Sequence, residues 1–283
     1  MQVTVNQPFD LAATLESGQS HRWALADDWY AGVINGNFVK MRQACGGFEF
    51  RSSPNAEKSL APVLKSYFRL DDDLPAIYGE IKRDRRVAEM VEQYPGLRVL
   101  RIEPFECLIA FICSANNNIS RIHQLMERMA ETFGEPIHMD GQVRYTFPGP
   151  AELAEGGELE LRRLGLGFRA PYVDQAARRV LAGDLNLDEL TKVPYPEAKE
   201  KLMECRGIGS KIADCIAVFS LEKLEAFPID VWIRRALAEW YFPCQKTPPD
   251  RVLLEWAQGH FGRYGGYAQQ YLFHGRRLAK KNK

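Results

Sequence analysis

A lysine and an aspartate stand at the expected starts of two consecutive helices. Lys211 opens a stretch of helical spacing over 211–221, and Asp230, 19 positions later, directly precedes another over 231–240. The positive end of a helix dipole disfavours an ammonium group, so we expect Lys211 to supply the neutral amine that nucleophilic or Schiff-base chemistry requires. Asp230 is a good N-cap, and the backbone N–H groups bound by a capping carboxylate favour its ionised form. If both side chains face one cleft, they suit departure of a leaving group through an oxocarbenium-like state at a sugar carbon. The alternative role of Asp230 is helix capping alone.

Two glycines separate the helix of Lys211 from the helix before it. The sequence predicts a helix over 196–205, a tight turn containing Gly207 and Gly209, and then the helix over 211–221. We expect the glycines to take positive φ and to expose N–H groups that bind phosphate, with Lys211 beside them. An ordinary hairpin of two helices would give the same pattern. Cys215 lies one turn after Lys211 on the same face, where it lines the same pocket or is a small core residue.

The elements that must position these residues follow a two-part pattern. Short alternating segments over 2–6, 21–25, 29–34, 37–43 and 47–51 predict strands, and Asn35-Gly36 predicts a hairpin turn between two of them. Helical spacing begins near Asn55, the apolar run over 105–114 predicts a buried helix, and almost everything after Pro104 is expected to be helical. The predicted fold class is α+β, with a small N-terminal antiparallel β-rich domain and trailing helices (1–98), followed by a larger all-α domain (99–283) whose helix-hairpin-helix spans 196–221.

Composition excludes several classes of protein. Lys and Arg number 37, as do Asp and Glu, and this balance argues against a protein that coats nucleic acid indiscriminately. The six cysteines show no C-x-x-C spacing, so we expect no zinc or iron–sulfur site and no cofactor. No segment reads as a signal peptide or a membrane span, so the expected location is the cytoplasm.

The chemistry-bearing stretch resembles a known family. L-x-x-C-R-G-I-G-S-K-x-A-D-C over 202–215, followed by P-I-D-V over 228–231, is similar to the helix-hairpin-helix (HhH-GPD) DNA glycosylases, and most closely to their 8-oxoguanine DNA glycosylase/lyase branch. The likeness extends in order along nearly the whole chain. It includes S-G-Q-S over 17–20, C-S-x-N-N-N-I-x-R over 113–121, G-L-G-F-R-A over 165–170, and G-Y-A-Q-x-x-L-F over 266–273.

The resemblance implies a role for each matching residue. Lys211 attacks C1′ of a flipped nucleotide with Asp230 as its catalytic partner, and the carbonyl of Gly18 accepts the N7–H that 8-oxoguanine has and guanine lacks. Such a buried hydrogen bond rejects the analogue that lacks it. The remaining roles are base stacking by Phe273 and Cys215, reading of the Watson–Crick edge by Gln269, filling of the duplex gap by Asn116, contact with the orphaned base by Arg121 and Arg169, and wedging by Phe168.

The implied function is a bifunctional DNA glycosylase and AP lyase of base excision repair. It would act as a monomer on double-stranded DNA containing 8-oxoguanine opposite cytosine, at the nucleoid of a prokaryote or in the nucleus of a eukaryote. Two positions depart from the best-known eukaryotic members, which carry Phe at His21 and His at Trp232. A neutral indole at Trp232 would contribute less to a phosphate contact than a charged donor. The alternatives are a non-catalytic helix-hairpin-helix DNA-binding protein and a glycosylase for another damaged base.

Overall fold

The first part of the chain forms a five-stranded antiparallel sheet. The computed structural model describes residues 1–243 and 246–281. The strand order is β1-β5-β4-β3-β2, so β2 to β5 form the expected meander and β1 pairs with β5. The expected Asn35-Gly36 turn joins β3 to β4, with φ of 45° and 71°. The strands are β1 (Gln2–Thr4), β2 (Ala24–Ala26), β3 (Trp29–Ile34), β4 (Asn37–Ala44) and β5 (Gly47–Ser53).

One predicted strand is shorter than expected. The segment predicted as a strand over 21–25 contributes only Ala24–Ala26 to the sheet. His21 and Arg22 instead turn toward the helical part of the molecule, where Arg22 Nε donates to Glu127 Oε1 at 2.8 Å. Burial of these two side chains therefore replaces ladder pairing at this point.

Helices make up most of the remaining chain. Their bounds are α1 (Leu11–Leu15), α2 (Glu57–Tyr67), α3 (Leu74–Ile81), α4 (Arg85–Gln93), α5 (Pro104–Cys113), α6 (Ile119–Phe133), α7 (Pro150–Arg163), α8 (Ala170–Ala182), α9 (Leu187–Lys192), α10 (Tyr195–Met203), α11 (Ser210–Ser220), α12 (Val231–Tyr241), α13 (Asp250–Phe261) and α14 (Gly265–Lys281), with short 3-10 turns at Gly167–Arg169 and Gly262–Tyr264. The predicted α+β fold class is confirmed. No helix within the described ranges is both long and apolar enough to cross a membrane.

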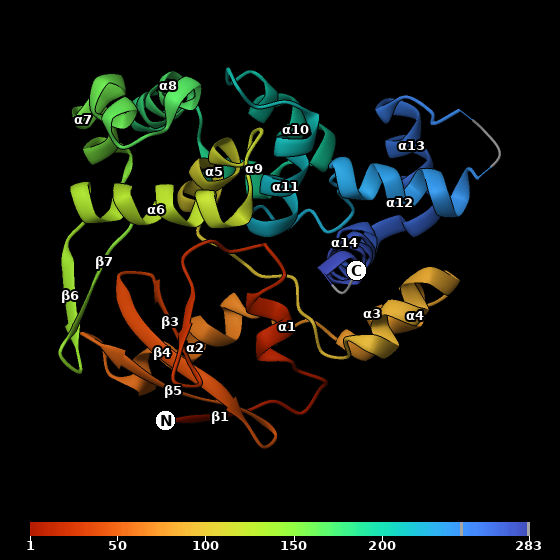
Figure 1. Cartoon of the computed structure of the whole chain (residues 1–283), viewed down its shortest axis with the longest axis horizontal. Helices are drawn as coiled ribbons and strands as arrows, with labels where there is room; N and C mark the ends of the chain where they lie inside the picture. The colour runs from red at the N-terminus through yellow and green to blue at the C-terminus, as the bar shows by residue number, and fades with distance from the viewer. Residues whose placement is uncertain (244–245, 282–283) are drawn as a thin grey trace.

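A second hairpin was not expected. Strands β6 (Pro136–Met139) and β7 (Gln142–Tyr145) leave the helical part and lie beside the sheet (Figure 1). Because side chains alternate along a strand, Val39 of β4 packs into the main core, whereas Phe38 packs against Ile137 of β6 in a smaller cluster. The expectation that almost everything after Pro104 is helical was wrong here, because the hairpin is needed to cover this second face.

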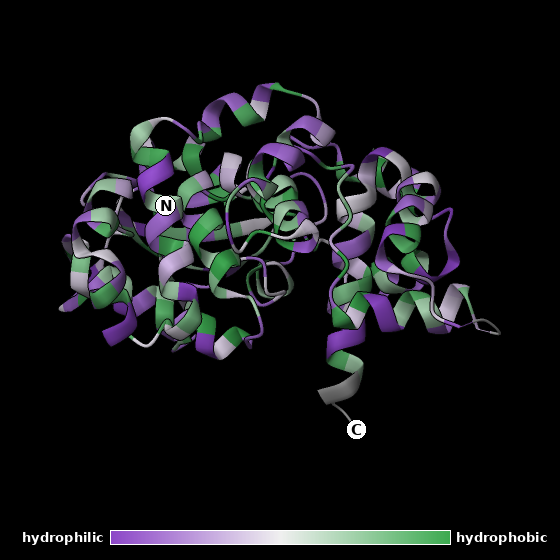
Figure 2. Ribbon diagram, turned by 90° about the horizontal axis from the view of Figure 1, so that it is seen from above, coloured by the Kyte–Doolittle hydropathy of each residue, from purple (hydrophilic) through white to green (hydrophobic). Residues whose placement is uncertain are grey.

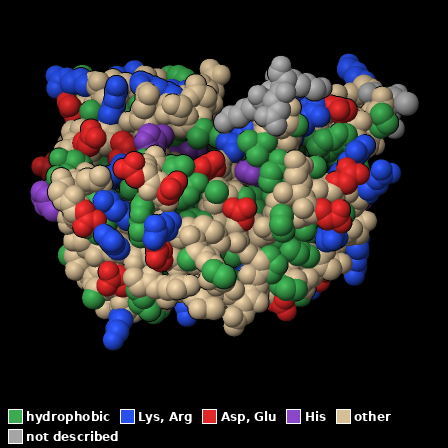
Figure 3. All heavy atoms as spheres, turned by 60° about the horizontal axis from the view of Figure 1, so that its bottom comes forward, with side chains coloured by type: hydrophobic (Ala, Val, Ile, Leu, Met, Phe, Trp, Pro, Cys, Tyr) green, Lys and Arg blue, Asp and Glu red, His purple; other side chains and the backbone are tan. Residues whose placement is uncertain are grey.

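The helical part is built around α5, which is buried as predicted. Every apolar side chain of α5 from Phe105 to Cys113 is less than a tenth exposed, and α5 contacts α6, α8, α9 and α11. Figure 2 shows hydrophobic stretches on the helices in the middle of the ribbon and hydrophilic stretches on its outer turns. At one end of the molecule, α12, α13 and α14 gather with α3 and α4 (Figure 1). On the face drawn in Figure 3, basic and acidic side chains are interspersed, as the balanced composition predicts.

Candidate active site

The turn between α10 and α11 places Lys211 at the second residue of α11. Gly207 has φ +89°, and a Cβ there would lie 2.5 Å from Cδ2 of Tyr172, so both the backbone and the packed ring require glycine. Gly209 is different: its φ is −92°, and a Cβ would meet no described atom within 4 Å. The expectation of positive φ at both glycines was therefore wrong for Gly209, which takes extended backbone as the N-cap of α11.

The amine of Lys211 lies against the C-terminal end of α5. Its Nζ donates to Ser114 Oγ at 3.3 Å and is 5.4 Å from the centre of the Phe111 ring. The side chain is half-buried, so it is enclosed by protein on one side and open on the other. No role for Ser114 or Phe111 is predicted from the sequence, because a separation of about a hundred residues is bridged only by the packing of α5 on α11.

Cys215 lies one turn further along α11 and is buried. Burial raises the pKa of its thiol to about 11, and the nearby charge of Lys211 opposes this shift. Cys215 is therefore a neutral thiol near neutral pH. A buried, uncharged and polarisable sulfur provides an apolar wall rather than a nucleophile.

Asp230 is the N-cap of α12, as predicted. Its Oδ1 accepts from the backbone N–H of Trp232 at 3.0 Å and of Ile233 at 2.8 Å. Burial raises the pKa of Asp230 above its usual value, while these N–H groups and the charge of Lys211 act in the opposite direction. The carboxylate is thus partly desolvated and lies within electrostatic range of Lys211, so the two predicted catalytic residues share one region.

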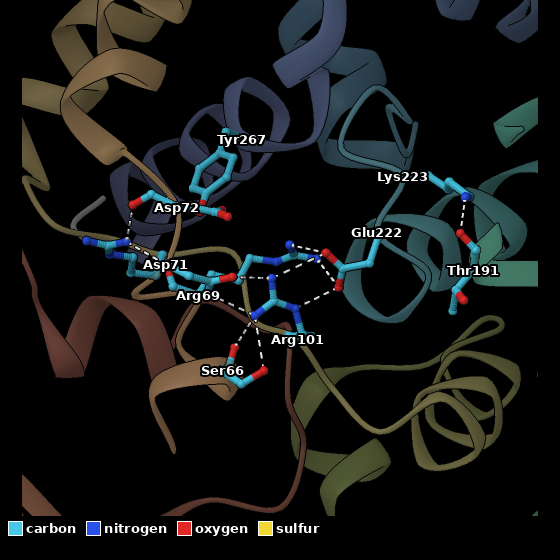
Figure 4. A network of polar contacts seen from close by, with 10 residues as sticks. Ser66, Arg69, Asp71, Asp72, Arg101, Thr191, Glu222, Lys223 and Tyr267 are labelled. Atoms are coloured by element: carbon cyan, nitrogen blue, oxygen red, sulfur yellow. Dashed lines mark hydrogen bonds and ion pairs between the residues drawn. The ribbon is translucent and has the colours of Figure 1, made fainter. Parts of the chain in front are cut away.

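The loop between α11 and α12 is fastened to the N-terminal part of the chain (Figure 4). The carboxylate of Glu222 accepts from Arg69 Nη1 at 2.7 Å and from Arg101 Nε at 2.7 Å, although Glu222 itself has φ +60°. Next along the loop, Lys223 Nζ donates to the carbonyl of Thr191 at 2.6 Å. These contacts fix the path by which the chain returns from the end of α11 to Asp230.

Three of the four residues expected to hold a base, Gly18, Gln269 and Phe273, lie where α14 approaches the loop after α1. Gly18 has φ +81°, and a Cβ there would lie 3.0 Å from Ile119 Cδ1 and 3.4 Å from Phe273 Cε1. Gln269 is 5% exposed, and its Oε1 is buried with no hydrogen-bond partner in the described part of the chain. A buried acceptor without a partner is costly and is suited to a ligand that donates to it.

The residues expected to face the partner base form a second group, in the segments just beyond the C-terminal end of α5. Arg169 donates from Nε and Nη2 to the carbonyl of Ala115, at 2.8 and 2.5 Å, and from Nη2 to that of Asn116 at 2.9 Å. Arg121 donates to the carbonyl of Gly165 at 3.2 Å, in the turn that precedes Arg169. The remaining two are exposed: Asn116 has φ 49°, and Phe168 is 49% exposed with the Arg169 guanidinium 4.3 Å from its ring centre.

His21 is buried against Phe111, the ring that also lies beside Nζ of Lys211. Its ring lies edge-on to Phe111, with the centroids 6.0 Å apart, and neither ring nitrogen has a hydrogen-bond partner among the described residues. Burial, together with the charges of Lys211 and His123, lowers the pKa of His21 to about 3. His21 is therefore a neutral ring and occupies the position of an aromatic side chain without adding a charge.

Comparisons with known proteins agree with this geometry. The family model for the 8-oxoguanine DNA glycosylase N-terminal domain matches residues 2–108, and that for HhH-GPD superfamily base excision DNA repair proteins matches residues 109–257. A probable N-glycosylase/DNA lyase of Methanothermobacter thermautotrophicus is 31% identical over 95% of this chain and 94% of its own length. The N-glycosylase/DNA lyase OGG1 of Arabidopsis thaliana is 32% identical over 93% of this chain and 76% of its own length.

Solved structures extend the likeness to the whole fold. The 8-oxoguanine glycosylase/lyase of Clostridium acetobutylicum, in complex with dsDNA containing cytosine opposite to 8-oxoG, superposes with a TM-score of 0.91. It is 29% identical, and the match covers 99% of this chain and 98% of that one. Because the two family models together match residues 2–257, this chain belongs to the 8-oxoguanine DNA glycosylases of the HhH-GPD superfamily.

Proposed function

We propose that the protein is a bifunctional glycosylase and AP lyase that excises 8-oxoguanine from duplex DNA. The observation that carries the proposal is the pairing of Lys211, at the start of α11, with the partly desolvated carboxylate of Asp230, at the start of α12. A non-catalytic DNA-binding hairpin would require Gly207 but not this pair. The names of the relatives, N-glycosylase/DNA lyase and 8-oxoguanine glycosylase/lyase, support the same reaction.

The reaction divides between the two residues. As the bond from C1′ to the base breaks, the base leaves with the bonding electrons, and Asp230 stabilises the positive charge that develops on the sugar. The amine of Lys211, once the ammonium group has lost a proton, forms a bond to C1′ and then releases a second proton. Opening of the sugar ring gives a Schiff base, and loss of the proton at C2′ then expels the 3′ phosphate by β-elimination.

Gly18, Gln269, Phe273 and Cys215 are the proposed base-recognition residues. The flipped base would stack between the Phe273 ring and the neutral Cys215 thiol, while Gln269 contacts its Watson–Crick edge. The buried Oε1 of Gln269, which has no partner among the described residues, supports this role because N1–H and the exocyclic amine of the base are donors. The Gly18 carbonyl would accept N7–H, and guanine would present a lone pair there instead.

The rest of the duplex would be held by two groups of residues. Asn116 and Phe168, both exposed, would fill the gap and wedge beside it, and the guanidinium groups of Arg121 and Arg169 would contact cytosine at O2 and N3. The open space at Gly209 supports close approach of a phosphate to the hairpin, beside Gly207 and Lys211.

The working unit we propose is a monomer in the compartment that holds the DNA, which is the nucleoid of a prokaryote or the nucleus of a eukaryote. The division into a domain of residues 1–98 and another of residues 99–283 stays a prediction.

Borohydride trapping tests the proposal. With a duplex that contains one 8-oxoguanine opposite cytosine, borohydride should reduce the Schiff base and leave a covalent adduct of protein and DNA. The adduct should disappear in Lys211→Gln, because an amide cannot form the imine. No adduct with the parent protein, or a full yield with Lys211→Gln, would reject the assignment. Trapping on a duplex with a different damaged base but not on 8-oxoguanine would favour the alternative glycosylase.

A further inference from the structure

Helix α14 holds the backbone immediately before Gly18. Gln270 is 2% exposed, and its Nε2 donates to the carbonyl of Ser17 at 3.1 Å. Two turns later, Arg277 donates from Nη2 to the carbonyl of Glu16. The two side chains are seven positions apart and so lie on one face of α14, and each binds one of the two carbonyls that precede Gly18.

The backbone after Gly18 is fixed from the other direction. Gln19 is 1% exposed, and its Nε2 donates to Ser17 Oγ at 2.8 Å and to the carbonyl of Arg98 at 2.8 Å. Its Oε1 accepts from the backbone N–H of Leu100 at 2.8 Å. The Gly18 carbonyl therefore lies between residues that are held on one side by α14 and on the other by the contacts of Gln19.

The same helix carries two of the side chains that we assign to the base. Gln269 precedes Gln270, and Phe273 lies one turn before Arg277, whose guanidinium is 5.9 Å from the centre of the Phe273 ring. A shift of α14 therefore moves the base-reading residues and the tethers of the loop together. The loop around Gly18 and these two side chains are thus held by one helix.

We propose that Gln270 and Arg277 are positioning residues for substrate specificity, which act by aiming the Gly18 carbonyl at N7 of the damaged base. This inference rests on the proposed function. Neither side chain needs to touch the base: each donates a hydrogen bond to the backbone next to the discriminating carbonyl. Losing either tether lets that carbonyl turn away, and a misplacement of about 1 Å in a reacting complex can cost on the order of 10²-fold in rate.

Two reactions of the same protein separate this role from general stability. Excision of 8-oxoguanine requires the base to be read, whereas cleavage of a preformed abasic site requires Lys211 and Asp230 but no base. For Gln270→Leu and Arg277→Met, which keep side-chain bulk and remove the donor, single-turnover excision should fall by roughly tenfold to 10²-fold. Cleavage at the abasic site should stay within about twofold of the parent rate, since its catalytic groups are unchanged.

Matched variants complete the test. Arg277→Lys keeps a donor and should recover most of the excision rate. Arg276→Met makes the same change at the neighbouring position, which pairs with Glu239, and should leave both rates near those of the parent.

Unchanged excision in Gln270→Leu and Arg277→Met would overturn the inference. So would a parallel loss of both reactions, or an Arg277→Lys variant as impaired as Arg277→Met. A parent protein that cleaves abasic sites but leaves 8-oxoguanine in place would instead overturn the proposed substrate.

Discussion

Replacement of Asp230 by asparagine distinguishes its two roles, catalysis and helix capping. Both capping hydrogen bonds, from Trp232 and Ile233, are accepted by the single oxygen Oδ1. The amide oxygen of asparagine can take that place, with its NH2 group where Oδ2 stood. Asparagine caps helices about as well as aspartate, so the free energy of unfolding should change by no more than about 1 kcal/mol.

The direction of that small change follows from burial. Because burial raises the folded-state pKa of Asp230 above its usual value of 3.8, the unfolded chain loses this proton more readily than the folded protein. The parent protein therefore loses stability as the pH rises from 3.8 through the folded-state pKa, and Asp230→Asn does not. Above that window the variant should be as stable as the parent or slightly more stable.

Catalysis should respond very differently. A neutral amide cannot stabilise positive charge on the sugar, and loss of one preorganised electrostatic group typically costs about 10² to 10³ in rate, or about 2.7 to 4 kcal/mol. Single-turnover excision of 8-oxoguanine should show this loss, while the melting temperature and the affinity for damaged duplex stay close to those of the parent. Near-normal excision in a folded Asp230→Asn protein would refute the catalytic role.

Three further predictions concern the hairpin, the partner base and His21. Gly207→Ala should destabilise the fold by about 1–3 kcal/mol, because of its positive φ and the Tyr172 ring, whereas Gly209→Ala should melt near the parent temperature but bind duplex DNA more weakly. Excision should be fastest opposite cytosine, and Arg169→Met should lower that rate more than the rates opposite the other three bases; an equal loss opposite all four would leave Arg169 without this role. The pKa of His21 falls from 6.5 in the unfolded chain to about 3 in the folded protein. Between these two pH values the unfolded chain binds this proton and the folded protein does not, so the free energy of unfolding falls as the pH drops from 6.5 toward 3. His21→Phe avoids that loss and should gain about 2 kcal/mol relative to the parent between pH 8 and pH 5, measured by denaturant unfolding at both pH values.

Local signals predicted the elements best. The strands that became β3, β4 and β5, the buried helix α5, and the cap at Asp230 each depend on residues close together in the chain. The missed hairpin β6–β7 carries a comparable signal: its turn is Asp140-Gly141, with φ of 52° and 72°. The turn alone does not predict the strands, because four-residue strands within a helical region show little alternation.

Contacts between residues far apart in the chain could not be predicted from the sequence. The resemblance implies which residues recognise the base, and those roles stay predictions, but nothing in the spacing connects Gln270 to Ser17, which are 253 positions apart. The same holds for Lys211 and Ser114, which are 97 positions apart. The difference between Gly207 and Gly209 was also hidden, because it depends on where the Tyr172 ring packs.

The hairpin β6–β7 has a consequence for how the molecule unfolds. It belongs to the helical part by sequence, yet Ile137 covers Phe38 of the sheet, and Asp140 pairs with Lys40 of β4 at 3.3 Å. On the opposite face, the main core runs without interruption from Val39 of β4 to Leu272 of α14. Neither part can be removed without exposing apolar surface of the other, so we expect heat or denaturant to melt both in one cooperative transition.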